Sequence, residues 1–212
     1  MPAFEGLDPF YLIVPDAASV ARFAKLGVRT IQLRAKALSS AAARREIIAS
    51  LDATMGTACQ LIVNDYWREA LSVGADYIHL GQEDLADADL ATIKAAGIRI
   101  GISTHDQAEL AVALATEPDY IALGPIFPTT TKSTGRPAQG LAQITAWRAM
   151  IPDHCPLIAI GGITLEHAPA LIAAGAQSCS VVSDVLSHAR PDARTRDWLT
   201  WSDAVLSRHT PR

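Results

Sequence analysis

Two acidic side chains follow consecutive hydrophobic runs and are of the type that binds a divalent cation. Asp65 comes shortly after the run Gln60–Val63, and Asp84 comes shortly after the run Tyr77–Leu80. Mg²⁺ prefers oxygen ligands and usually takes one or two protein carboxylates, with water and phosphate oxygens in its remaining positions. An aspartate before a helix is also a common N-cap. Because the two runs are neighbours in the chain, the pattern favours a shared Mg²⁺ site over two separate caps.

A group of polar side chains between residues 32 and 36 is suited to a diphosphate. In an extended segment, alternation would place Gln32, Arg34 and Lys36 on one side. Two cations and an amide donor on one face can hold phosphate oxygens. The same residues could equally be solvated charges at the end of a strand, so this segment alone leaves both interpretations open.

Residues after three later runs are suited to a second anion. A long polar segment contains Thr129, Thr131 and Lys132, which offer hydroxyls and a cation for phosphate oxygens. Loops of this length are often lids or binding loops. Gly162 and Ser183 follow the last two runs, where barrels of alternating strands and helices frequently bind a phosphate through backbone N–H groups. These residues predict a phosphate site.

The remaining polar candidates do not supply an obvious nucleophile. Ser103 could donate a hydrogen bond near these groups, although a serine before a helix is also an ordinary cap. His105 is expected to be structural, and His79 is as readily a hydrogen-bonded core residue as a substrate contact. The chain shows no Ser/His/Asp order, no activated Cys motif and no carboxylate pair suited to glycoside chemistry. The inventory favours departure of a diphosphate, stabilised by cations, over covalent hydrolysis.

Eight short apolar or β-branched runs must position these residues. They are expected as strands at Phe10–Val14, Val28–Leu33, Gln60–Val63, Tyr77–Leu80, Ile98–Ile102, Tyr120–Leu123, Leu157–Ile160 and Ser178–Val182. Several runs are continuous, as in strands covered on both faces, and the stretches between them are long enough for crossover helices. Eight such units in 212 residues favour an α/β fold, the closed (β/α)₈ or TIM barrel, over a doubly wound sheet. Active sites of such barrels lie at the C-terminal ends of the strands, where the polar residues above are found.

The chain is expected to form a single domain over residues 1–212, with a tail that becomes helical from about residue 191 and then frays. Gly27, Gly74, Gly97 and Gly175 each precede a predicted strand and are typical of helix C-caps.

Composition excludes several classes of protein. Three cysteines without a C-x-x-C pair argue against a disulfide framework and a structural zinc site, and they fit a reducing cytoplasm. The net charge is −4 and no cluster of Lys and Arg is present, so the sequence gives no sign of a positively charged surface for nucleic acid or an anionic membrane. No secretory leader or long apolar stretch is evident. Small-molecule substrates are the expected partners, and the sequence leaves a homo-oligomer open.

Taken together and in order, these motifs resemble those of thiamine phosphate synthases. The similarity spans nearly the whole chain and is carried by residues 32–36, 63–65, 79–84, 101–105, 124–132 and 160–163. Several motifs in the right order, each at a strand end, are more specific than any one of them.

The resemblance implies a transferase of thiamine biosynthesis that joins 4-amino-2-methyl-5-hydroxymethylpyrimidine diphosphate to hydroxyethylthiazole phosphate with Mg²⁺. In that family diphosphate leaves first, and the thiazole nitrogen captures a stabilised pyrimidine methyl cation. Carried over by position, the catalytic residues would be Arg34, Lys36, Ser103 and Lys132. The pyrimidine diphosphate would be bound by Gln32, Arg34, Lys36, Asn64, Ser103 and Lys132. The thiazole phosphate would be bound by Thr129, Thr131, Gly162, Val182 and Ser183, and the implied substrate contacts also include Leu33, Ala35 and Thr130. Asp65 and Asp84 would hold the metal.

Two positions depart from the family pattern, and three other functions compete with it. The family often has Glu where Ala35 stands and Arg where Tyr66 stands. A thiazole tautomerase-like relative would need no metal or diphosphate residues, and it tends to carry a His near Pro125 and Ile126. A Schiff-base aldolase or sugar phosphate isomerase would need a desolvated lysine, for which Lys132 in a polar loop is a poor candidate. A non-catalytic sensor of a phosphorylated vitamin precursor stays open.

Overall fold

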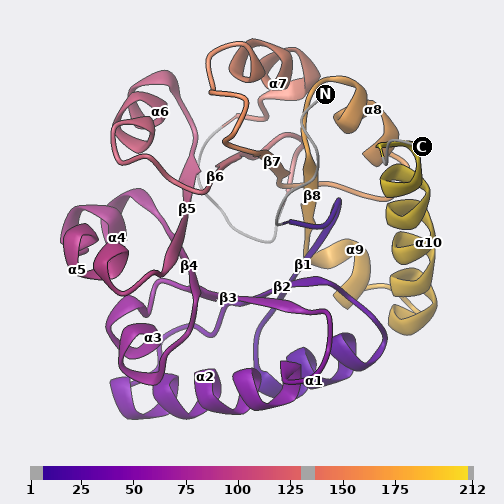
Figure 1. The fold of residues 1–212 in the computed structure, drawn as a ribbon. Helices are drawn as coiled ribbons and strands as arrows, with labels where there is room; N and C mark the ends of the chain where they lie inside the picture. Colours follow the sequence, from indigo (N-terminus) through magenta and orange to yellow (C-terminus); the bar gives the residue numbers. More distant parts are fainter. Residues whose placement is uncertain (1–6, 130–136, 210–212) are drawn as a thin grey trace.

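The computed structural model describes residues 7–129 and 137–209, which form a closed barrel of parallel strands surrounded by helices (Figure 1). Each strand pairs with the next in the chain, and the last pairs with the first. The strands of this part of the chain are β1 (Phe10–Val14), β2 (Thr30–Leu33), β3 (Gln60–Asn64), β4 (Tyr77–Leu80), β5 (Arg99–Thr104), β6 (Tyr120–Leu123), β7 (Leu157–Ile160) and β8 (Ser178–Val181).

Helices connect the strands and form the outer layer of the barrel (Figure 1). They are α1 (Ala17–Lys25), α2 (Ser40–Thr54), α3 (Trp67–Val73), α4 (Gln82–Asp87), α5 (Leu90–Ala95), α6 (Gln107–Leu114), α7 (Gly140–Arg148), α8 (Ala168–Ala173), α9 (Ser183–Leu186) and α10 (Pro191–His209). The described residues include no helix long and apolar enough to cross a membrane.

The predicted barrel is confirmed, and the strand limits differ in ways that hydrogen bonding explains. β2 begins two residues later than expected because the N–H of Val28 bonds back to the carbonyl of Phe23 at the end of α1. β5 continues to Thr104 because this residue still pairs with Leu123 of β6. The C-cap predicted at Gly74 is observed, with φ +75° directly after α3.

Strand residues alternate between the helical layer and the barrel interior. In β1, Leu12 packs in the large cluster that includes the helices, whereas Tyr11 and Ile13 belong to a separate inner cluster. The inner cluster consists of Leu7, Tyr11, Ile13, Ile62, Tyr77, Tyr120, Ala122 and Ile158. The interior is therefore filled by side chains, and three of these are tyrosines whose hydroxyls need hydrogen-bond partners.

Gly101 makes room for one of these tyrosines. His79, Gly101 and Tyr120 lie in register on β4, β5 and β6. A Cβ atom at Gly101 would lie 2.0 Å from Cζ of Tyr120. Since only glycine leaves this space, the Tyr120 ring crosses β5 and stacks on the His79 imidazole, with ring centroids 5.5 Å apart.

The three cysteines are free thiols. Burial raises the pKa of Cys59 to about 12 and that of Cys155 to about 11, so both thiols are protonated at neutral pH. This agrees with the absence of an activated cysteine motif in the sequence.

Candidate active site

A cavity of about 1010 Å³, counted to its open mouth, lies at the C-terminal ends of the strands. This is the end of the barrel where the sequence predicts the site. The cavity brings together most of the predicted site residues, namely Gln32, Arg34, Asn64, Asp65, Asp84, Ser103, Thr129, Gly162, Val182 and Ser183.

Three residues predicted after β2 do not line the cavity. Leu33 is buried in the core, Ala35 packs against that core, and Lys36 is exposed. The expected alternation does not continue to Lys36 because β2 ends at Leu33. The predicted Thr130, Thr131 and Lys132 lie outside the described residues.

The two aspartates line the cavity, and neither is an N-cap residue. The N-cap position of α3 is Tyr66 and that of α4 is Gly81. Asp65 has φ +64°, and its N–H donates to the carbonyl of His79, which ties this residue to β4. A Cβ atom on Gly81 would lie 3.1 Å from Oδ2 of Asp84, so glycine leaves space beside this carboxylate.

The donor set fits a magnesium ion. Asp65 and Asp84 offer carboxylate oxygens to one cavity. No group of three or more His, Cys, Asp or Glu within the described residues is placed to hold a metal ion. A pair of carboxylates, with water and substrate phosphate completing the shell, is the arrangement that Mg²⁺ commonly uses, unlike a transition metal held by protein ligands alone.

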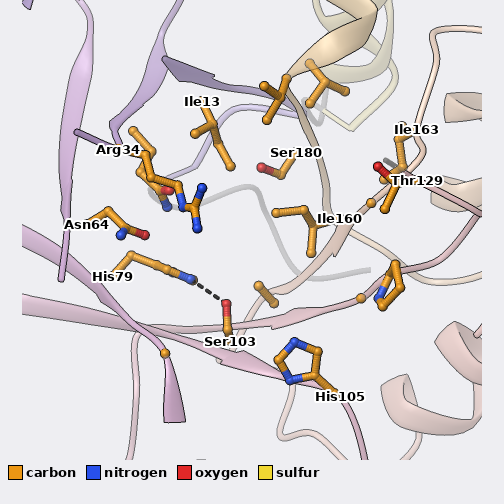
Figure 2. A pocket seen from close by; sticks show the side chains of 18 of the residues that line it. Ile13, Arg34, Asn64, His79, Ser103, His105, Thr129, Ile160, Ile163 and Ser180 are labelled. Atoms are coloured by element: carbon orange, nitrogen blue, oxygen red, sulfur yellow. Dashed lines mark hydrogen bonds between the residues drawn. The ribbon is translucent and has the colours of Figure 1, made fainter. Parts of the chain in front are cut away.

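Arg34 provides a positive charge on the same side of the cavity. Its backbone N–H donates to the carbonyl of Val14 at 2.8 Å, which fixes the residue directly after β2. In Figure 2 the side chains of Arg34, Asn64 and His79 point into the cavity from one side. A guanidinium in this place can bind phosphate oxygens in a bidentate manner.

A chain of hydrogen bonds runs from the barrel interior to Ser103. The amide nitrogen of Gln32 donates to the Tyr11 hydroxyl at 2.7 Å, and the hydroxyls of Tyr11 and Tyr120 lie 2.9 Å apart. Nδ1 of His79 lies 2.6 Å from the Tyr120 hydroxyl, and its Nε2 lies 2.7 Å from Oγ of Ser103 (Figure 2). Burial raises the pKa of both tyrosines well above the ordinary value, so both hydroxyls keep their protons. His79, whose role the sequence left open, therefore uses both ring nitrogens in this chain.

The opposite side of the cavity is built largely from backbone. Gly162 follows β7 with φ +65°, and a Cβ atom there would lie 2.5 Å from the carbonyl oxygen of Pro128. The N–H groups of Ile126 and Phe127 donate to the carbonyls of Ile160 and Gly161. The segments after β6 and β7 thus form one surface, and a side chain at position 162 would separate them.

Residues of α10 hold the short helix α9 in place. The Asp184 carboxylate accepts hydrogen bonds from Arg194 at 2.9 Å and from Nε1 of Trp198 at 2.7 Å. Arg194 also pairs with Glu166, in the segment after β7. This arginine lowers the pKa of Glu166 to about 2. Arg194 therefore connects the two segments that carry Gly162 and Ser183.

Comparison with known proteins assigns the family. A family model described as thiamine monophosphate synthase matches residues 10–185. The chain belongs to the thiamine monophosphate synthase family. It is 51% identical to a thiamine-phosphate synthase of Rhizobium etli, over 91% of this chain and 94% of that protein. It is 47% identical to one of Neisseria meningitidis serogroup B, over 91% and 93% of the two chains.

A solved structure gives the same assignment. The thiamine phosphate pyrophosphorylase from Pyrococcus furiosus superposes with a TM-score of 0.80 and 25% identity, over 93% of this chain and 96% of that chain. The similarity of fold therefore extends across nearly the whole length of both chains. The predicted resemblance is confirmed, and this chain is an enzyme of the transferase class.

Tyr66, where the resemblance leads us to expect Arg, contributes to the local structure. Its hydroxyl accepts a hydrogen bond of 2.9 Å from the backbone N–H of Leu38. The side chain thereby holds the segment between β2 and α2, which begins at Arg34. Tyr66 does not itself line the cavity, and neither does Ala35, the other departing residue.

The polar residues that line the cavity include Ser180 and His105, neither of which the sequence assigns to the site. Ser180 of β8 is 2% exposed, lines the cavity, and its Oγ has no hydrogen-bond partner among the described residues. Its alternation with Cys179 in β8 could have indicated an inward-facing hydroxyl. His105, expected to be structural, lines the cavity as well, and its Nδ1 bonds to Glu109 at 2.7 Å.

Proposed function

We propose that this chain condenses 4-amino-2-methyl-5-hydroxymethylpyrimidine diphosphate with hydroxyethylthiazole phosphate to give thiamine phosphate and diphosphate, in a reaction that depends on Mg²⁺. The observation that supports this proposal is that one cavity is lined by two separate sets of residues suited to binding phosphate groups, the first of them with the help of Mg²⁺. Asp65, Asp84 and Arg34 line one side, and Gly162 and Ser183 line the other. Two phosphorylated substrates require such an arrangement, whereas a single phosphorylated substrate does not.

The first surface suits the leaving diphosphate. Asp65 and Asp84 would hold Mg²⁺, which when bound would offset the charge that develops on the departing diphosphate oxygens. Arg34 follows β2, the neighbour of β3 in the barrel, and contributes a cation to the same cavity. Lys36 and Lys132 are proposed as further cations for this group. Lys36 is exposed here and Lys132 lies outside the described residues, so neither is assigned a contact.

Polar side chains beside this surface suit the pyrimidine ring. Gln32, Asn64 and Ser103 line the cavity from β2, β3 and β5. These residues would orient the ring while the bond between its methylene carbon and the diphosphate oxygen breaks. The thiazole nitrogen then forms the new bond to that carbon, and no protein nucleophile is needed.

The second surface suits the phosphate of the thiazole. Thr129 offers a hydroxyl, and Gly162, Val182 and Ser183 line the cavity where backbone N–H groups can approach an anion. Thr130 and Thr131 would add hydroxyls from outside the described residues. Anchoring this phosphate beside the pyrimidine makes the second step effectively unimolecular, which is a large source of rate enhancement.

The other functions fit the site less well. Schiff-base chemistry needs a desolvated lysine, and Lys36 is exposed outside the cavity. A tautomerase-like relative would be expected to carry a histidine near Pro125 and Ile126, and it would have no use for the carboxylate pair of Asp65 and Asp84.

The test is formation of thiamine phosphate from the two substrates, with Mg²⁺ and with a chelator, followed by chromatography. Wild type should form product only with the metal. Asp65→Asn and Asp84→Asn should lower the rate on the order of 100-fold or more, because each removes a carboxylate that would hold Mg²⁺ beside the leaving diphosphate. Asp153→Asn, an exposed position outside the cavity, is the matched control and should have no effect. Absence of product from folded wild type, or product that persists with chelator and in both variants, would contradict the proposal.

A further inference from the structure

The hydrogen-bond chain from Gln32 to Ser103 joins two predicted pyrimidine-binding residues through the barrel interior. Tyr11, Tyr120 and His79 lie between them. Tyr11 and Tyr120 are 1% and 0% exposed and His79 is 6% exposed, so the interior links are shielded from water. Both ends of the chain line the cavity. The protonation pattern inside the barrel therefore decides what each end presents to a ligand.

The chain has one direction, set by its inner end. The Gln32 amide nitrogen can only donate, and it donates to the Tyr11 hydroxyl. Each phenol has a single proton. If Tyr120 donated to Tyr11, the buried Tyr11 proton would have no acceptor among the described residues, so Tyr11 donates to Tyr120. Tyr120 then has its own proton left for Nδ1 of His79. A neutral imidazole that accepts at Nδ1 carries its proton on Nε2, and His79 therefore donates to Oγ of Ser103. Ser103 keeps its own proton for another acceptor.

Ring packing holds the links in place. The Tyr120 ring stacks on His79 with an interplanar angle of 18° and meets Tyr11 edge to face at 85°. Gly101 leaves the space that lets Tyr120 reach the imidazole. A fully satisfied polar network with fixed rings is rigid, and its members strengthen one another in a low-dielectric interior.

We propose that this chain fixes His79 as the Nε2–H tautomer and thereby makes Ser103 a hydrogen-bond donor to a pyrimidine ring nitrogen, with Tyr120 as a positioning residue. The identity of the ligand rests on the proposed function. If the direction were reversed, Ser103 would donate to His79 and could only accept from a ligand. A pyrimidine ring nitrogen is an acceptor, so only the direction set by Gln32 suits it, and a mismatched polar group is strongly disfavoured in a buried site.

The tautomer is tested first, without turnover. Nitrogen-15 NMR of the ligand-free protein labelled in histidine reports which ring nitrogen carries the proton, and His79→Gln assigns the signals of this residue. The expected wild-type pattern is a protonated Nε2 and an unprotonated Nδ1 that accepts a hydrogen bond. Tyr120→Phe should shift the Nδ1 signal towards that of a nitrogen without a donor. A wild-type His79 protonated at Nδ1 would overturn the proposal.

Kinetics then test the consequence for the ligand. Tyr120→Phe should raise KM for the pyrimidine diphosphate roughly 3–10-fold, the range of a weakened hydrogen bond, and leave KM for the thiazole phosphate unchanged. Tyr77→Phe is the matched control. Tyr77 is also buried, with its ring centroid 5.7 Å from that of Tyr120, but its hydroxyl takes no part in the four links. An equal rise of both KM values in Tyr120→Phe, or the same change in Tyr77→Phe, would indicate a packing role and overturn the proposal.

The two proposals fail in different ways. Lack of product from wild type with the expected His79 tautomer would contradict the function and leave the direction of the chain intact. Normal product formation with the opposite tautomer would contradict the chain alone.

Discussion

The two sides of the cavity are built by different means. On the side of β2 to β5, polar side chains face the cavity, and Gln32 and Ser103 are connected through buried hydrogen bonds. On the side of β6 to β8, the surface depends on backbone, with Gly162 pressed against the carbonyl oxygens of the preceding segment. We therefore expect the first side to bind a ligand through side-chain functional groups, and the second side through close approach of the main chain.

This difference determines how each side responds to substitution. A side chain on the first side can be replaced while the backbone stays in place. The binding free energy that is lost is then that of one ligand contact and of the hydrogen bonds that support it. On the second side, Gly162 cannot gain a side chain unless the segments after β6 and β7 move apart, because it has no free space around it. The second side should therefore be more sensitive to small additions, and the first to the loss of polar atoms.

The largest effect on the second side is expected for Gly162→Ala. The new Cβ would lie 2.5 Å from the carbonyl oxygen of Pro128 and 2.7 Å from that of Phe127, so the segment must move. A displacement of about 1 Å in a substrate-positioning segment can cost on the order of 100-fold in rate. Steady-state kinetics should show this loss with a raised KM for the thiazole phosphate.

Gly140→Ala is the matched control for that variant. Gly140 has a similar φ of +74° but nothing within 4 Å of the position of a new Cβ. It carries the same backbone strain without the clash. Equal losses of activity in the two variants would show that strain, and not separation of the segments, is responsible.

A comparable or smaller effect is expected for Arg34→Met, with Lys36→Met as the comparison variant. Arg34 lines the cavity, and loss of a hydrogen bond to a charged group costs about 1.5–3 kcal/mol, or roughly 10–150-fold in kcat/KM for the pyrimidine diphosphate. Lys36 is exposed outside the cavity, so Lys36→Met should lower kcat/KM less than Arg34→Met does. A larger loss from Lys36→Met would show that this side closes over the diphosphate in a way that the free enzyme does not display.

Ser180→Ala should have a modest effect on substrate binding. The substrate that is affected shows to which side of the cavity Ser180 belongs. Its buried Oγ has no partner among the described residues, so a bound substrate is the expected partner. Because β8 leads into Val182 and Ser183, KM for the thiazole phosphate should rise about 2–10-fold, the range of one neutral hydrogen bond. A rise in KM for the pyrimidine diphosphate alone would assign Ser180 to the first side of the cavity.

The smallest effect is expected on acid stability through Glu166. Arg194 lowers the pKa of this carboxyl from 4.5 to about 2. The native state is therefore stabilised by the ionised form above pH 4.5, and this stabilisation is lost as the pH falls from 4.5 towards 2. Denaturant unfolding of Glu166→Gln should show lower stability than wild type at pH 7 and a weaker dependence on pH in that window.

A double substitution controls the last prediction. In an Arg194→Gln background, Glu166→Gln should change the pH dependence much less, because the largest cause of the lowered pKa of Glu166 is already absent. A full effect of Glu166→Gln in that background would assign the shift to another neighbour.

The barrel and the acidic pair could be predicted because their signals are local. Strands appear as short apolar runs, and Asp65 and Asp84 follow two consecutive runs, so chain order alone places them at one end of the barrel. The placement of Lys36 could not be predicted in the same way. Alternation holds only while a strand continues, and nothing in the residues themselves shows that β2 ends at Leu33.

The buried chain could not be predicted because it depends on register across the closed barrel. Tyr11 and Tyr120 are separated by 109 positions, and their hydroxyls meet only inside the completed barrel. Each of these tyrosines looks like an ordinary core residue within an apolar strand. The one signal in the sequence is Gly101, because a glycine inside a strand often marks the close approach of another group.

The most direct test of the two-sided site is calorimetric binding of each substrate on its own, with Mg²⁺, to wild type, Arg34→Met and Gly162→Ala. A crossed pattern of binding losses is expected. Arg34→Met should weaken binding of the pyrimidine diphosphate and leave the thiazole phosphate unchanged, and Gly162→Ala should do the reverse. If each variant weakened both substrates to the same extent, the cavity would act as a single undivided site and the account would be contradicted.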